Sequence, residues 1–247
     1  MRPLLRAELI KLRSTRTFAA LAGVAVATSV VIVLLVSLLS EPSEESVLTD
    51  VFTADTSSLF ITILAIVGIT GEWRHRTITS SLLAAPNRLR FLTAKMLAFA
   101  TAGAVLSLMI SIGVGITGYV ILGLRDLPTP AFGEWLAQVG RNMAVAALLG
   151  GFGLALGSLV RNQAVAIVSV LMLGFVIEPT LLAVAPDVGI YGPFTGLPTA
   201  VQGIPGEDVG FEGAELLAPG AAALGMLAWI GVLFTGGAAL LDRRDLG

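Results

Sequence analysis

The sequence has no cysteine and only one histidine, His75, among its 247 residues. The lack of cysteine excludes disulfide bonds, thiolate metal sites and a cysteine nucleophile. Charged residues are also scarce: they make up 13% of the chain, against about a quarter in soluble domains. Apolar residues make up 55%, and the mean hydropathy is +0.91. These values predict an integral membrane protein.

Several functional motifs are missing as well. No GxxxxGK[ST] phosphate-binding loop occurs, so we do not expect this chain to hydrolyse ATP itself. Gly157-Ser158 lies in an apolar segment without the histidine that an intramembrane serine protease needs. We therefore expect no catalytic residue, no metal site, no cofactor bound by this chain and no nucleic-acid partner.

Long apolar segments make up most of the chain and predict an all-α fold with six transmembrane helices in a single domain, 1–247. The uncharged run 17–39 contains 23 residues, enough to cross a bilayer. Residues 1–16 before it hold five basic residues and one acid, interleaved with leucines, which favours an interfacial amphipathic helix. The expected spans are 17–39, 51–71, 96–122, 141–160, 164–185 and 217–241.

The segment 186–216 is rich in Gly and Pro and contains acids but no basic residue. Its stretch PFTGLPTAVQGIP is apolar enough to dip into the membrane as a re-entrant segment. Such backbone is tolerated only where it lies against protein or a wet cavity.

The distribution of charge predicts the orientation. The segments expected inside carry thirteen Lys and Arg, and those outside carry two, Arg125 and Arg141, together with eleven of the seventeen acids. Basic loops stay on the cytosolic side, so both termini are expected there. An Arg-, Ala- and Gly-rich composition is compatible with a high-GC bacterium, and the expected location is the bacterial plasma membrane.

The loop 71–96, GEWRHRTITSSLLAAPNRLRFLTAKM, holds five basic residues and a single acid, Glu72. Thr77 or Thr79 can cap a short helix, SSLLAA, which ends at Pro86. The loop has two interpretations: an ordinary positive-inside loop, or a handle through which a cytosolic partner moves the two adjoining spans.

Asp55 and Glu178 are the only acids expected near membrane depth, close to the outer ends of their spans. They have two interpretations as well. They can line an outward cavity or a proton relay, or they can lie at the interface with solvated or hydrogen-bonded carboxylates.

Three stretches in this order carry a family resemblance: AELIKLRSTRTF, then EWRHRTITSSLLAAPNRLRFLTAK after two spans, then GLALGSLVRNQAVAIV after four. Over essentially its whole length the chain resembles the membrane-spanning permease subunit of type-2 ATP-binding-cassette (ABC) exporters, the small bacterial six-span type. The residues that fit the family's loop between spans two and three are Glu72, Thr77, Leu82, Leu83, Pro86, Arg88 and Lys95, and Arg161 and Asn162 fit its turn after span four.

The resemblance implies a complex of two permease subunits, a second copy or a paralogue, with two cytosolic ABC ATPases that hold ATP and Mg. It implies that 71–96 is the coupling loop, with coupling residues Glu72, Arg74, Arg76, Thr77, Leu82, Leu83 and Arg88. Asp55 and Glu178 would border the pathway. The expected cargo is amphipathic or hydrophobic, such as a peptide antibiotic, a drug or a lipid, and export would confer resistance to drugs or antimicrobial peptides.

Two alternatives remain open from the sequence. The chain can be a non-transporting membrane anchor or sensory subunit for a cytosolic partner. It can also be a proton-coupled carrier, which would need no ATPase and would depend on Asp55 or Glu178.

Overall fold

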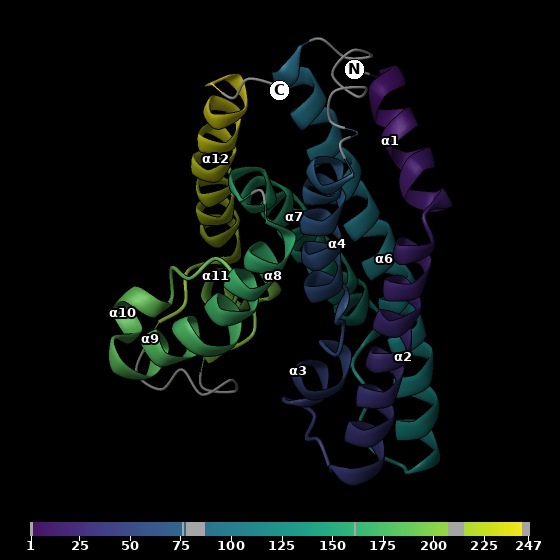
Figure 1. The fold of residues 1–247 in the computed structure, drawn as a ribbon. Helices are drawn as coiled ribbons and strands as arrows, with labels where there is room; N and C mark the ends of the chain where they lie inside the picture. Colours follow the sequence, from purple (N-terminus) through teal and green to yellow (C-terminus); the bar gives the residue numbers. More distant parts are fainter. Residues whose placement is uncertain (1, 76, 78–86, 161, 207–214, 244–247) are drawn as a thin grey trace.

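The computed structural model describes residues 2–75, 77, 87–160, 162–206 and 215–243, with side chains up to residue 240. Within these ranges the chain forms helices and no strand (Figure 1). In chain order they are α1 (Arg2–Ser14), α2 (Arg16–Leu39), α3 (Val47–Phe52), α4 (Ser57–Arg74), α6 (Arg88–Leu124), α7 (Phe132–Leu159), α8 (Gln163–Met172), the π-helical turn η1 (Leu173–Ile177), α9 (Glu178–Val184), α10 (Pro186–Gly189), α11 (Gly196–Gln202) and α12 (Pro219–Arg243).

Six helical segments are long and apolar enough to cross a membrane: Arg16–Leu39, Val47–Arg74, Arg88–Leu124, Phe132–Leu159, Gln163–Val184 and Pro219–Leu240. The prediction of an all-α chain with six helices long and apolar enough to cross a membrane is therefore confirmed for the described residues. Two of these segments are irregular. The second is interrupted between α3 and α4, and the fifth contains the π-helical turn before Glu178.

The helices extend beyond the uncharged runs from which their spans were predicted. The third begins at Arg88 instead of 96, because the Asn87 side chain accepts a hydrogen bond from the Arg90 amide (2.9 Å) and caps the helix there. The fourth begins at Phe132 instead of 141. Arg141, expected to open that span, lies inside α7, and its guanidinium donates to the Gln202 carbonyl (3.2 Å).

Helix α7 is the centre of the fold and contacts α4, α6, α11 and α12. Small residues allow these contacts. A Cβ atom on Gly153 would lie 2.5 Å from the Thr62 carbonyl oxygen, and one on Gly150 would lie 2.8 Å from that of Phe99. The glycine pattern of this span thus serves close helix packing within one subunit.

The remaining helices lie on either side of this centre (Figure 1). Helices α1 and α2 follow one another along α6, with which both make contacts. Helices α8 to α11 lie on the other side of the molecule, and α12 packs against α7 and α11. The first turn of α1 and the last turn of α12 lie at the same end, which we call the α1 end.

The described part of the Gly- and Pro-rich segment contains the short helices α10 and α11. Residues Gly196, Leu197, Pro198, Ala200 and Val201 of α11 are buried, and the helix packs against α7 and α12. Helix α11 is therefore covered by protein, and its entry into the membrane as a re-entrant segment stays a prediction.

Candidate functional site

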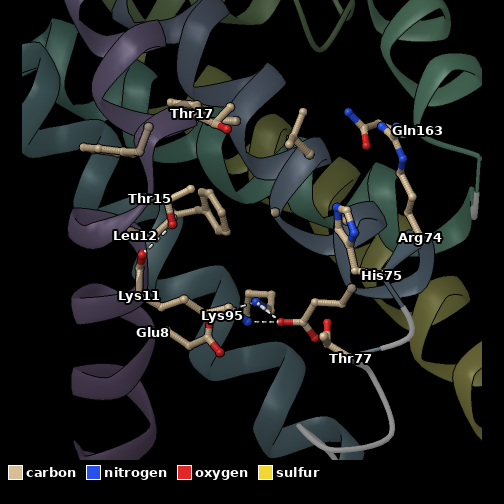
Figure 2. A pocket seen from close by; sticks show the side chains of 17 residues that line it. Glu8, Lys11, Leu12, Thr15, Thr17, Arg74, His75, Thr77, Lys95 and Gln163 are labelled. Atoms are coloured by element: carbon tan, nitrogen blue, oxygen red, sulfur yellow. Dashed lines mark hydrogen bonds and ion pairs between the residues drawn. The ribbon is translucent and has the colours of Figure 1, made fainter.

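Four charged side chains from three helices meet at the α1 end, and we call them the ion cluster (Figure 2). Lys95 of α6 lies at its centre. Its ammonium is 2.8 Å from Glu72 Oε1, at the end of α4, and 2.7 Å from Glu8 Oε2 of α1. Lys11 of α1 is 2.6 Å from the same Glu72 oxygen. The cluster thus joins α1 to the two helices on either side of residues 75–87.

The cluster is deeply buried on one side. The side chains of Lys95 and Glu72 are 2% and 3% exposed, whereas Lys11 is 51% exposed. Two cations face two carboxylates, so the charges balance. The Lys95 ammonium also lies 5.4 Å from the centre of the Phe91 ring, a favourable cation–π distance. Removal of one partner would leave a buried charge without compensation, which is strongly destabilising.

The sequence of α1 explains its attachment. Glu8 and Lys11 are three residues apart and share one helix face. Leu4 and Leu12 of the same helix pack against the apolar core formed by α4, α6 and α7, whereas Ile10 is exposed. Helix α1 therefore has one face fastened to the protein by both apolar and ionic contacts.

Lys11 is half-buried, and burial by itself lowers the pKa of an amine. The hydrogen bond and the charge of Glu72, with a smaller contribution from Glu8, outweigh this effect and raise the pKa of Lys11 above its usual value. The ammonium is therefore charged at physiological pH.

A pocket of about 500 Å³ opens beside the ion cluster (Figure 2). Its lining combines charged side chains, Glu8, Lys11, Glu72 and Lys95, with apolar ones, Leu12, Phe18, Leu64 and Phe99. His75 and Thr77, the first residues after α4, lie at its edge. A surface of this mixed character suits contact with an amphipathic group or a partner side chain.

Only some of the predicted coupling residues are among the described residues. Glu72, Arg74, Thr77 and Arg88 are described, whereas Arg76, Leu82, Leu83 and the turn residue Arg161 lie outside the described residues. Arg74 and Thr77 are exposed at the end of α4, and Arg88 is half-buried at the start of α6. The described coupling residues thus lie at the α1 end of α4 and α6.

Glu72, the single acid of the basic loop, is buried and pairs with Lys11 and Lys95. Glu8 and Lys11 were missed altogether. A signal was present, since Glu8 is the sole acid of residues 1–16 and Glu72 is the sole acid of residues 71–96.

Asp55 and Glu178 are both buried and belong to separate hydrogen-bond networks. Asp55, between α3 and α4, accepts hydrogen bonds from the Ser57 amide (2.8 Å) and from the hydroxyls of Ser107 and Ser111. Glu178 accepts hydrogen bonds from the backbone amides of Phe194 and Thr195, at the start of α11. Both carboxylates are therefore hydrogen-bonded, and their roles at the interface or in a pathway stay predictions.

The Asp55 network continues into α7 through Asn142, which sequence reasoning missed. Its amide nitrogen donates to Ser111 Oγ (3.2 Å) and to the Phe52 carbonyl (3.3 Å). Its carbonyl oxygen accepts from Gln138 (3.0 Å) and Gln202 (3.1 Å). The network therefore connects α3, α6, α7 and α11 inside the bundle.

Comparison with known proteins adds no family to this description, since no protein-family model and no curated protein matches the chain.

Proposed function

We propose that this chain is the permease subunit of an ABC transporter and exports an amphipathic or hydrophobic compound with ATP hydrolysed by a separate subunit. The chain has six helices suited to span a membrane and no phosphate-binding loop of its own. A second permease copy or paralogue and two cytosolic ATPases would complete the complex.

The observation that carries the proposal is the ion cluster. Lys95, Glu72 and Glu8 tie α1 and the ends of α4 and α6 into one unit next to residues 75–87. A push on that loop would be transmitted to all three helices together, because the contacts between them are buried and ionic. ATP-driven closure of the ATPases would then change access to a pathway between the two permeases, since the nucleotide favours one of two conformations.

The orientation follows from charge. The α1 end carries most of the Lys and Arg, so it would face the cytosol, where an ATPase can reach it. Helix α1 would lie at the cytosolic membrane surface with Ile10 toward lipid. The segment around α11 would dip in from the outer side, covered by α7 and α12.

Cysteine labelling tests this orientation. Ser43→Cys, in the acidic loop after α2, should react with an impermeant thiol reagent in intact cells, whereas Asn87→Cys, before α6, should react only after lysis. The chain has no native cysteine, so each signal has one source. Labelling of Asn87→Cys in intact cells with none at Ser43→Cys would reverse the orientation.

The transport function is tested by purification of the tagged chain from its native membranes. We expect an ABC ATPase to co-purify, and the complex in vesicles to move a fluorescent amphiphile with ATP but not with a non-hydrolysable analogue. Co-purification without ATP-dependent movement of any amphiphile would favour the anchor or sensory role instead. Movement driven by a proton gradient without ATP would favour the carrier.

A further inference from the structure

The second membrane-spanning segment is broken at the end opposite the ion cluster. Helix α3 ends at Phe52 and α4 begins at Ser57, with Asp55 in the break. The break is held in place, because Ser29 Oγ of α2 accepts from the Thr56 amide (3.0 Å) and the Thr56 hydroxyl donates to the Ala25 carbonyl (3.1 Å). The backbone around Asp55 is thus preformed.

Asp55 is 9% exposed, and among the described residues no Lys or Arg forms an ion pair with it. The ion pairs of Glu8, Lys11, Glu72 and Lys95 lie at the other end of the bundle. An acid inside a membrane protein is costly without a compensating charge, so a buried acid without an ion pair is a candidate functional residue.

Oxygen atoms gather around this carboxylate. The hydroxyls of Ser107 and Ser111 lie within hydrogen-bond distance of it. The Ser57 hydroxyl lies near the same carboxylate. Ser57 is only 1% exposed, and among the described residues its hydroxyl has no hydrogen-bond partner of good geometry, although it lies beside the Asp55 carboxylate. A buried hydroxyl without a partner is rare and calls for an explanation.

We propose that Asp55, Ser57, Ser107 and Ser111 bind a sodium ion at the break between α3 and α4. Hard cations prefer carboxylate, hydroxyl and carbonyl oxygens. Broken membrane helices supply such sites, because the backbone in the break is free to line the ion. A single carboxylate matches a monovalent ion, since a divalent ion would leave a buried net positive charge.

The serine hydroxyls can serve as ligands because each carries two acceptor lone pairs and can rotate its proton away from the ion. Asn142 would position Ser111, to which its amide donates. The site does not depend on the proposed transport function, because all of its ligands come from this chain.

The test uses the purified full-length chain in detergent, with thermal unfolding followed in NaCl and in choline chloride at equal ionic strength. We expect Na⁺ at about 100 mM to raise Tm by about 3 °C or more over choline. Asp55→Asn should abolish this difference, and Ser57→Ala should reduce it by at least half. Glu178→Gln, which neutralises a buried acid in another network, should keep it.

Binding of ²²Na⁺ to the same samples provides a direct second measurement. If Asp55→Asn does not fold, Ser57→Ala is the variant to compare with the unaltered chain. Saturable binding that weakens several-fold in Ser57→Ala supports the site. Equal Tm in Na⁺ and choline for the unaltered chain, or a Na⁺ effect that Ser57→Ala leaves intact, overturns it. A Tm that does not depend on Na⁺ but depends on pH, with the pH dependence lost in Asp55→Asn, would identify a proton in place of the ion. That result also overturns the sodium site.

Discussion

Lys95 and Glu72 lie 2.8 Å apart with both side chains almost completely buried, at the two ends of the loop that the sequence marks as its most basic stretch. Each has a further partner on α1, Glu8 for Lys95 and Lys11 for Glu72. The pair therefore closes the base of the loop and fastens α1 in the same place.

The first prediction concerns this buried pair. Lys95→Met should destabilise the protein by about 3–5 kcal/mol, because it leaves the Glu72 and Glu8 carboxylates without their central cation. Arg90→Met, on the exposed side of the same helix, should change stability by less than about 1 kcal/mol. Denaturant unfolding in detergent measures both.

A double variant tests whether the loss arises from the pair itself. Lys95→Met combined with Glu72→Met should be less destabilising than the sum of the two single changes, because the double change leaves fewer uncompensated buried charges. Simple additivity would show that the two side chains act independently and would contradict the ion cluster as a unit.

The second prediction concerns pH and Lys11. The pKa of Lys11 is raised from 10.5 by Glu72 and Glu8, despite burial. The folded state then binds the proton more tightly than the unfolded state, so the contribution of Lys11 is complete below pH 10.5 and is lost as the pH rises through the higher folded-state pKa.

Comparison with Lys11→Gln isolates this effect. The unaltered chain should have the higher Tm at neutral pH, and the difference between the two should shrink as the pH rises above 10.5. Arg13→Gln provides a matched control, because arginine stays protonated over this range. A Tm difference for Lys11→Gln that is constant with pH would show that Lys11 contributes by packing instead of charge.

The sequence predicted the helices well because membrane insertion depends on the summed hydropathy of long segments, such as the run 17–39. It did not locate the start of α6 or α7, because both helices begin before the uncharged runs. The Asn87 side chain caps the start of α6. The length of a helix and the length of its uncharged core differ, and composition predicts mainly the uncharged core.

The candidate site was predicted only in part for a different reason. Glu72 stood out as the single acid of a basic loop, but its partners come from α1 and α6. Pairings between helices depend on how each helix is rotated and where it docks, and these follow from tertiary packing. The same holds for Asn142, which gains its role only because α7 lies against α3 and α6.

The third prediction concerns Glu178, whose carboxylate accepts the backbone amides of Phe194 and Thr195. Glu178→Gln should lower stability by about 1–3 kcal/mol, because charge-assisted hydrogen bonds to the start of α11 are weakened. Gly192→Ala should act in the same direction, since its Cβ would lie 2.5 Å from Glu178 Oε2.

Glu215→Gln is the matched control, an exposed acid in the same part of the chain, and should leave stability unchanged. If Glu178 is purely structural, transport by folded Glu178→Gln protein should stay within a few-fold of the unaltered complex. Lost transport with unaltered stability and ATPase activity would instead place Glu178 in the cargo or proton pathway.

The fourth prediction tests the coupling role of the loop. Leu82 and Leu83 lie outside the described residues, between α4 and α6, and as apolar side chains in a basic loop they need lipid or a partner to cover them. Leu82→Asp with Leu83→Asp should weaken co-purification of the ATPase and abolish the stimulation of its hydrolysis by cargo, because two charges would be buried at the contact.

A second double variant controls for the effect of added charge on folding. Leu39→Asp with Leu124→Asp introduces the same two charges at the opposite end of the bundle, where these side chains are 80% and 81% exposed. Its assembly with the ATPase should be unchanged, and both double variants should insert and unfold like the parent chain. Normal assembly and normal stimulation in the Leu82/Leu83 variant would leave 71–96 as an ordinary positive-inside loop, and the ATPase contact would then have to lie elsewhere on the α1 end.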